Sequence, residues 1–219
     1  MKYCLTWLLF FMGLYCFGQN KTNLKEVVVR PDHAKVVLGT HKQKADYGHG
    51  GSRAYPNYQT AFLVPSSGVE GFIDRVGIYI YHKHTFLELF KKPNKLRIYL
   101  YAVNAKGLPG ELLLPQPIVI QPEKNSYWHW VDVSGYHLTL PKEGIFAAVG
   151  WPQARKEDTG PYVGMTNECD NCPFYVYRFL TDEPTWFKVE PSQHKGRNEE
   201  EKYNQNLMVR LEVSVKQKP

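Results

Sequence analysis

The sequence predicts an all-β fold, an antiparallel β-sandwich that is jelly-roll-like in the manner of galactose-binding-like domains. Three observations predict it. From Phe72 onward, apolar residues alternate with polar or aromatic ones, which is the pattern of half-buried strands. Turns rich in Gly and Pro separate these segments, and no stretch of useful length repeats with the period of a helix. Many short strands joined by turns favour an antiparallel sandwich over a sheet of alternating strands and helices.

The clearest strands lie on either side of residue 90. In the segment 72–81, every second residue from Val76 to Ile80 is aliphatic, and Tyr79 lies between them. The segment 96–103 repeats this pattern, with leucine and isoleucine on one face and tyrosine on the other. Because side chains alternate across a strand, each strand should have one aliphatic face and one face that carries tyrosines.

The rest of the chain continues with short strands and turns. The Gly- and Pro-containing segment 104–110 predicts a turn, and residues 85–90 could form one helical turn. Further strands are predicted at Ile118–Ile120, Tyr127–Val133, Ile145–Trp151, Phe174–Phe179, Trp186–Val189 and Leu207–Val215.

The first 18 residues predict a signal peptide. Lys2 precedes an apolar run that ends at Phe17, and Gly18 follows it. This run is shorter than the roughly 20 residues that span a membrane, so we expect cleavage near Gly18 and no membrane span. The mature protein should be exported, to the periplasm, the outer membrane or the medium. A lipoprotein signal at Cys16 is the alternative, although bulky Tyr15 stands where such a signal has a small residue.

After the signal peptide, the predicted organisation is residues 19–70 as an arm or as added strands, followed by a sandwich domain over 71–219. The first part contains short apolar strands at 26–29 and 35–38, and a Gly- and His-rich loop over 41–56. The formal charge of the whole chain is +6, with the basic residues scattered. Such a surface suits a soluble protein and does not predict nucleic-acid binding.

Only Cys169 and Cys172 remain after removal of the signal peptide. In an oxidising compartment, this pair predicts a local disulfide that pins a loop. Redox catalysis is the alternative, but the surrounding Pro and Gly residues indicate a loop rather than the helix N-terminus that such chemistry uses. A second alternative is a structural calcium ion held by Glu168, Asp170 and loop carbonyl groups.

The densest aromatic cluster predicts a ligand-binding surface formed by Tyr127, Trp128, Trp130 and Tyr136. Aromatic faces stack on sugar rings, and the Tyr hydroxyl and Trp N–H groups supply hydrogen bonds. The ligand would be a glycan or an envelope protein. The alternative is that these side chains fill the core of the sandwich, because large aromatic residues are also common there.

No catalytic motif accompanies the candidate catalytic residues, so we expect a protein that is not an enzyme. His49, in a Gly-rich loop, could act with a carboxylate in an envelope hydrolase, but no nucleophile motif is present. His82 and His84 would share one face of a strand, yet no third metal ligand lies nearby in the sequence. The sequence therefore predicts no metal site and no cofactor.

The chain resembles a family of exported proteins from Bacteroidetes-type bacteria, many of which are labelled as carboxypeptidase-like regulatory-domain proteins. The resemblance covers about two thirds of the mature chain. It rests on Leu24–Val29, Ile98–Tyr101, Gly107–Leu113, Trp130–Val133, Leu140–Phe146 and Trp151.

These motifs specify strands and turns more than chemistry. Family members usually carry an acidic residue before the last tryptophan, where this chain has Gly150. Fuller members carry an additional N-terminal regulatory domain, for which this chain has no room before its first strand. The resemblance therefore implies an exported sandwich without peptidase activity, and a binding or structural role in the cell envelope.

Overall fold

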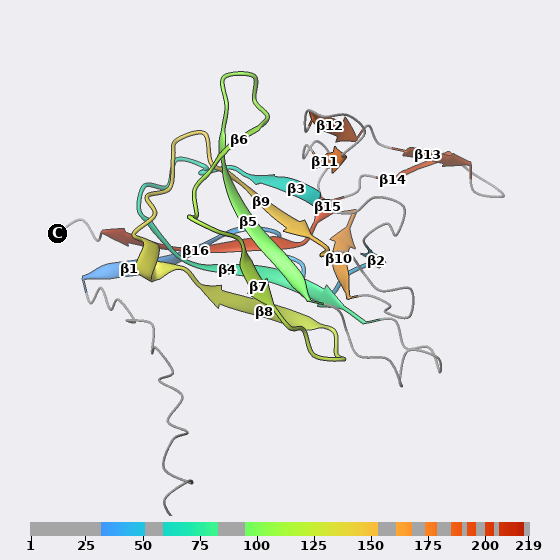
Figure 1. Ribbon diagram of the computed structural model, residues 1–219, viewed down its shortest axis with the longest axis horizontal. Helices are drawn as coiled ribbons and strands as arrows, with labels where there is room; N and C mark the ends of the chain where they lie inside the picture. The colour runs from blue at the N-terminus through green and yellow to red at the C-terminus, as the bar shows by residue number, and fades with distance from the viewer. Residues whose placement is uncertain are drawn as a thin grey trace, which may run out of the picture.

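The computed structural model describes residues 32–50, 59–82, 95–152, 161–167, 174–178, 185–189, 192–195, 200–203 and 206–216. They form two antiparallel sheets that pack against each other, together with a separate two-stranded sheet (Figure 1). The predicted all-β sandwich is confirmed. No helix in the described part of the chain is long and apolar enough to cross a membrane.

The first sheet has seven strands, and its path is β1-β16-β4-β10-β15. Strand β2 pairs with β10, and β8 pairs with β4. The bounds are β1 His33–Gly39, β2 Tyr47–His49, β4 Phe72–Tyr81, β8 Tyr127–Asp132, β10 Tyr162–Thr166, β15 Asn206–Leu207 and β16 Val209–Lys216.

The second sheet also has seven strands, and its path is β12-β11-β3-β9-β5-β6, with β7 paired to β5. Strands β13 (Ser192–Lys195) and β14 (Glu200–Tyr203) form the two-stranded sheet. The bounds in the second sheet are β3 Gln59–Val64, β5 Leu96–Val103, β6 Pro109–Leu112, β7 Ile118–Ile120, β9 Ile145–Gly150, β11 Phe174–Arg178 and β12 Thr185–Val189.

The core lies between the two sheets, where the predicted aliphatic faces meet. Val76 and Ile78 of β4 are fully buried in one cluster with Ile98 and Leu100 of β5. Burial of such side chains is the main favourable term in folding. The aliphatic residues that alternate along β4 and β5 therefore face the opposite sheet, as the sequence predicted.

Strands from residues 33–64 belong to both sheets. Strand β1 pairs with β16 at one end of the first sheet, while β3 lies between β9 and β11 in the second. The prediction of a loop throughout 41–56 is wrong at β2, because Tyr47–His49 pair with β10.

Three further local predictions need correction. Strand β6 begins inside the predicted turn, and β10 occupies a segment interpreted as loop because of its Pro and Gly residues. In β10, Gly164 leaves room for the ring of Tyr79, so glycine serves close packing here rather than a turn. The predicted last strand is divided at Met208, whose N–H bonds β10 while its carbonyl bonds β4.

Several predictions fall on residues outside those described. They are the signal peptide and its lipoprotein alternative, the strand at 26–29, the helical turn at 85–90, the Cys169–Cys172 disulfide and the calcium loop with Glu168 and Asp170. They stay predictions.

Candidate functional site

The outer face of the first sheet carries a network of charged side chains beside a β-bulge. Arg75 pairs with Glu212 across β4 and β16, whereas the next opposed pair is Ile73 with Val213. Asp74 is therefore the extra residue of β4, and the bulge turns its side chain toward the same face as Arg75. The Asp74 carboxylate is buried and accepts hydrogen bonds from Lys35 and Ser214.

Glu212 contacts two cationic side chains, Arg75 and Lys35, and Lys35 also contacts Asp74. The guanidinium of Arg75 donates two hydrogen bonds to Glu212, one of them at 3.0 Å, and Lys35 lies 3.4 Å away. The hydrogen bonds from Arg75 lower the pKa of Glu212, since they favour its charged form. Burial alone would lower the pKa of Lys35, but its contacts with Asp74 and Glu212 outweigh this and raise it. The network is thus internally neutralised.

Trp128 and Trp130 lie on this same outer face, because they stand opposite Tyr79 and Gly77 of β4. The ring of Trp130 lies over Gly77, where an added Cβ would meet it at 3.0 Å. Trp128 contacts Tyr79 edge-to-face, with ring centroids 5.5 Å apart. The two indoles are 6.3 Å apart. Neither tryptophan belongs to the core between the sheets.

Arginine side chains cover both indoles. Arg210 lies 3.9 Å from the centre of the Trp128 ring, and Arg75 lies 5.0 Å from that of Trp130. Such cation–π contacts are favourable when partly desolvated. The Arg210 guanidinium also donates to the carbonyl oxygens of Thr40, His41 and Lys42. Arg210 therefore links the Trp128 ring to the connection between β1 and β2.

The other two predicted ligand residues face the opposite way. Tyr127 and Tyr136 are partly buried and pack against the core between the sheets. The Tyr127 hydroxyl accepts a hydrogen bond from the N–H of Glu123 and lies 3.1 Å from Nδ1 of His129. The four aromatic residues are therefore neighbours in sequence but do not form one surface.

His49 of β2 lies at the core side of the first sheet. Its Nε2 is 3.4 Å from the Thr60 hydroxyl, and its ring contacts Trp151 edge-to-face at 5.8 Å. Burial lowers the pKa of His49 to about 4, because the charged imidazolium is poorly solvated there. A carboxylate partner would act in the opposite direction.

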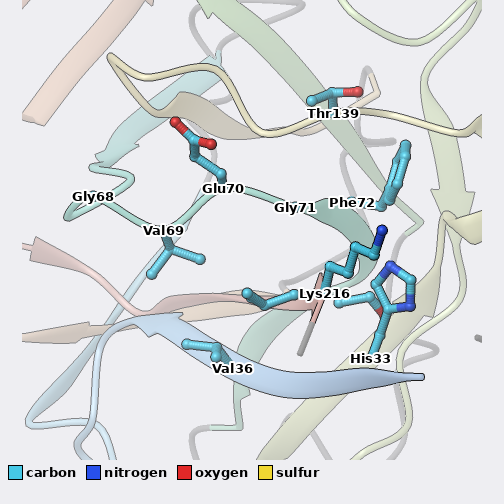
Figure 2. A pocket seen from close by; sticks show the side chains of 11 residues that line it. His33, Val36, Gly68, Val69, Glu70, Gly71, Phe72, Thr139 and Lys216 are labelled. Atoms are coloured by element: carbon cyan, nitrogen blue, oxygen red, sulfur yellow. The ribbon is translucent and has the colours of Figure 1, made fainter. Parts of the chain in front are cut away.

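A groove lies at one side of the sandwich, between β1, the end of β16 and the connection from β3 to β4 (Figure 2). Its volume is about 970 Å³. Aliphatic side chains of Val36, Val69 and Val215 line it. A separate, smaller hollow of about 420 Å³ lies between the end of β1 and β3.

Charged groups stand at opposite ends of this groove. Figure 2 shows Lys216 reaching between His33 and Phe72, with Glu70 at the far end. Nδ1 of His33 is buried and has no hydrogen-bond partner among the described residues. No local motif in the sequence signals this groove, because residues 33, 70 and 216 meet only in the folded chain. The only signal was the strand pattern at the two ends of the chain.

Of the two histidines considered as metal ligands, His84 lies outside the described residues. His82 directly follows β4, and its N–H donates to the Ser126 hydroxyl at 2.9 Å. Within the described ranges, no group of three or more His, Cys, Asp or Glu side chains is arranged to hold a metal ion.

A comparison with protein-family models gives no match for this chain, and a comparison with curated proteins gives none either.

Proposed function

We propose that the protein is an exported, non-enzymatic binding module of the bacterial cell envelope, and that it holds a segment of an envelope protein in the groove beside β1. The groove itself is the observation that carries the proposal. It is a concave surface of about 970 Å³, which is in the range of ligand sites. Binding modules of this kind need a shaped surface and no reacting group.

The lining favours a polypeptide over a carbohydrate. Val36, Val69 and Val215 offer aliphatic contacts, and among the described lining residues only Phe72 carries a phenyl, phenol or indole ring. Aliphatic pockets suit apolar side chains, whereas sugar rings are bound by flat aromatic faces. Lys216 and Glu70, at opposite ends, could each pair with an opposite charge on the ligand and thereby fix its direction.

Trp128 and Trp130, the candidate sugar-binding residues, support the carbohydrate alternative less well than the groove supports a polypeptide ligand. Trp128 already stacks with Arg210, whose guanidinium is fixed by three carbonyl groups. A sugar would have to displace this arrangement. The hydrolase alternative is less well supported, because burial lowers the pKa of His49 to about 4 and so weakens it as a base for the Thr60 hydroxyl 3.4 Å away.

Site-specific photo-crosslinking tests the proposal. The mature protein carrying Lys216→p-benzoylphenylalanine should give a discrete protein adduct when irradiated with an envelope extract of the producing bacterium. The matched control is Val119→p-benzoylphenylalanine, since Val119 is 55% exposed on β7 of the other sheet. The control should give no such adduct. Adding Glu70→Lys should weaken crosslinking at position 216 by reversing the charge at the far end of the groove.

Two parallel screens can overturn the proposal. Glycan-array binding that Trp130→Ala abolishes would move the site to the outer face of the first sheet. Turnover of an esterase, peptidase or glycosidase substrate that His49→Ala abolishes would make the protein a hydrolase. Equal crosslinking at positions 216 and 119 would show that the groove has no selective role.

A further inference from the structure

Strand β1 ends the path of the first sheet, and within the described residues it pairs only with β16. It is seven residues long, His33–Gly39, and contains no proline. The bulge of this sheet is in β4, so β1 itself keeps a continuous register from His33 to Gly39. Proline, bulges and very short length are the usual protections of an edge strand, and β1 has none of them.

The alternation of hydrogen-bonded and non-hydrogen-bonded pairs between β1 and β16 shows which backbone groups of β1 face its open side. The N–H of Thr40 bonds the carbonyl of Val209 at 2.9 Å, in the same register as the β1–β16 pairs. Because bonded and non-bonded pairs alternate in an antiparallel ladder, Val36 and Leu38 also bond β16. The N–H and C=O groups of Lys35 and Val37 therefore point away from β16. They have no backbone partner among the described residues.

The side chains of this edge also permit pairing. Val37 is 41% exposed on the outer face, one of the large apolar residues that the described surface leaves open. Lys35 would normally discourage pairing through its charge, but here Asp74 and Glu212 neutralise it. An additional strand would cover Val37 without bringing an unpaired charge against it.

We propose that two copies of this chain associate through β1, in antiparallel pairing about a two-fold axis at Val36. In this register Lys35 of each copy forms a bonded pair with Val37 of the other, which uses the open N–H and C=O groups of both residues. A register centred on Lys35 would oppose two lysines directly, and one centred on Val36 avoids this. The interface is isologous, so the same seven-residue strand supplies both sides.

A cysteine trap tests this register. With Cys169→Ser and Cys172→Ser in place, the variant Val36→Cys should form a covalent dimer on mild oxidation. The two copies of residue 36 would form a non-bonded pair with Cα atoms about 4.5 Å apart, which is within disulfide range. The matched control is Ala34→Cys, whose two copies would be four residues out of line, about 13 Å along the strand. The control should stay monomeric on non-reducing gels.

Sedimentation of the mature protein tests the association itself. The unchanged protein should be dimeric, and Val37→Pro should be monomeric, because proline removes an N–H that bonds nothing in the single copy. Val37→Lys should weaken the dimer through a charge in place of the exposed valine, whereas Val119→Lys on β7 should leave it intact. Circular dichroism establishes that each variant is folded.

A folded mature protein that is monomeric at its highest soluble concentration would overturn the proposal. A dimer that survives both Val37→Pro and Val37→Lys would overturn it too. Equal crosslinking of Val36→Cys and Ala34→Cys would reject the register and the two-fold axis. Val36 also lines the groove, so ligand capture is scored separately, by the Lys216 crosslinking in the protein whose β1 is unchanged.

Discussion

The outer faces of the two sheets both carry aromatic side chains, but different kinds of residue cover these rings on each sheet. On the first sheet, Arg210 and Arg75 lie over Trp128 and Trp130. On the second sheet, aromatic rings cover one another and small residues. Its cluster consists of Ala61, Tyr99, Phe146 and Ala148, packed against Leu63, Tyr101, Val103, Leu108, Leu112 and Trp186.

The ring contacts described on the second sheet join uncharged groups. Tyr99 and Tyr101 stack with centroids 5.9 Å apart, and Trp186 of β12 meets Tyr101 edge-to-face at 5.6 Å. Phe146 is completely buried although its side chain points away from the core between the sheets. The same alternation of residues therefore gives a second apolar core on one sheet and a surface held by charged contacts on the other. The two faces should therefore respond differently to truncation, acid and salt.

The largest effect is expected on the second sheet. Phe146→Ala should lower the free energy of unfolding by about 3–5 kcal/mol, because it removes a fully buried ring and leaves a cavity. Urea denaturation measures the loss. Phe187→Ala is the matched control, since Phe187 is 45% exposed on β12 of the same sheet. It should change stability by about 0.5 kcal/mol or less. Equal effects of the two variants would mean that this second cluster does not exist.

On the first sheet, the buried carboxylate of the bulge should matter more than any exposed charge. Asp74→Ala should lower the free energy of unfolding by about 1–3 kcal/mol, because Ser214 loses its acceptor and Lys35 loses one of its two acidic partners. Glu111→Ala, an exposed carboxylate on β6, serves as control and should have little effect. An Asp74 variant as stable as the control would show that the network contributes nothing.

Acid should weaken the first face through Glu212. Arg75 lowers the pKa of this carboxyl in the folded state below its ordinary value of 4.5. The resulting stability is complete above pH 4.5 and is lost as the pH falls through the folded pKa. Because the side chains of Arg75 and Lys35 are nearly half exposed, solvent screening limits this loss to about 1 kcal/mol.

Urea denaturation from pH 5 down to pH 3 checks this. Glu212→Gln should flatten the dependence relative to the unchanged protein, while Phe146→Ala, on the other face, should keep the dependence at lower overall stability. A Glu212→Gln variant that keeps the full acid dependence would contradict the assignment.

The smallest effect is the coupling of Arg210 to Trp128. A double-mutant cycle with Arg210→Ala and Trp128→Ala should give a coupling energy of about 0.5–1 kcal/mol, as expected for a partly exposed cation–π contact. Arg97→Ala with Trp128→Ala provides the control, because these residues belong to different sheets. A cycle without coupling would mean that Arg210 acts only through its hydrogen bonds to Thr40, His41 and Lys42.

The sequence alone determined the all-β architecture and the inward faces of its clearest strands. Val76 and Ile78 lie on the same face of β4 because side chains alternate along a strand, and they are buried because that face meets the other sheet. The alternation can be read from the local sequence without knowing which strands are neighbours. The aromatic cluster was also visible, since Tyr127 to Trp130 are consecutive residues. The alternation of side chains along β8 divides this cluster into two faces.

The tertiary structure decided what each face meets, because that depends on which strands become neighbours. Pairing of β10 with β4 makes a strand from a Gly-containing segment that looks like a loop. Coverage by β12 and the β5–β6 region turns the outward-pointing Phe146 into a core residue. The groove exists only because β1 and β16, which are nearly the whole chain apart, lie side by side with the connection from β3 to β4. Such long-range pairing carries no local pattern, since its cause is the combined burial of both sheets.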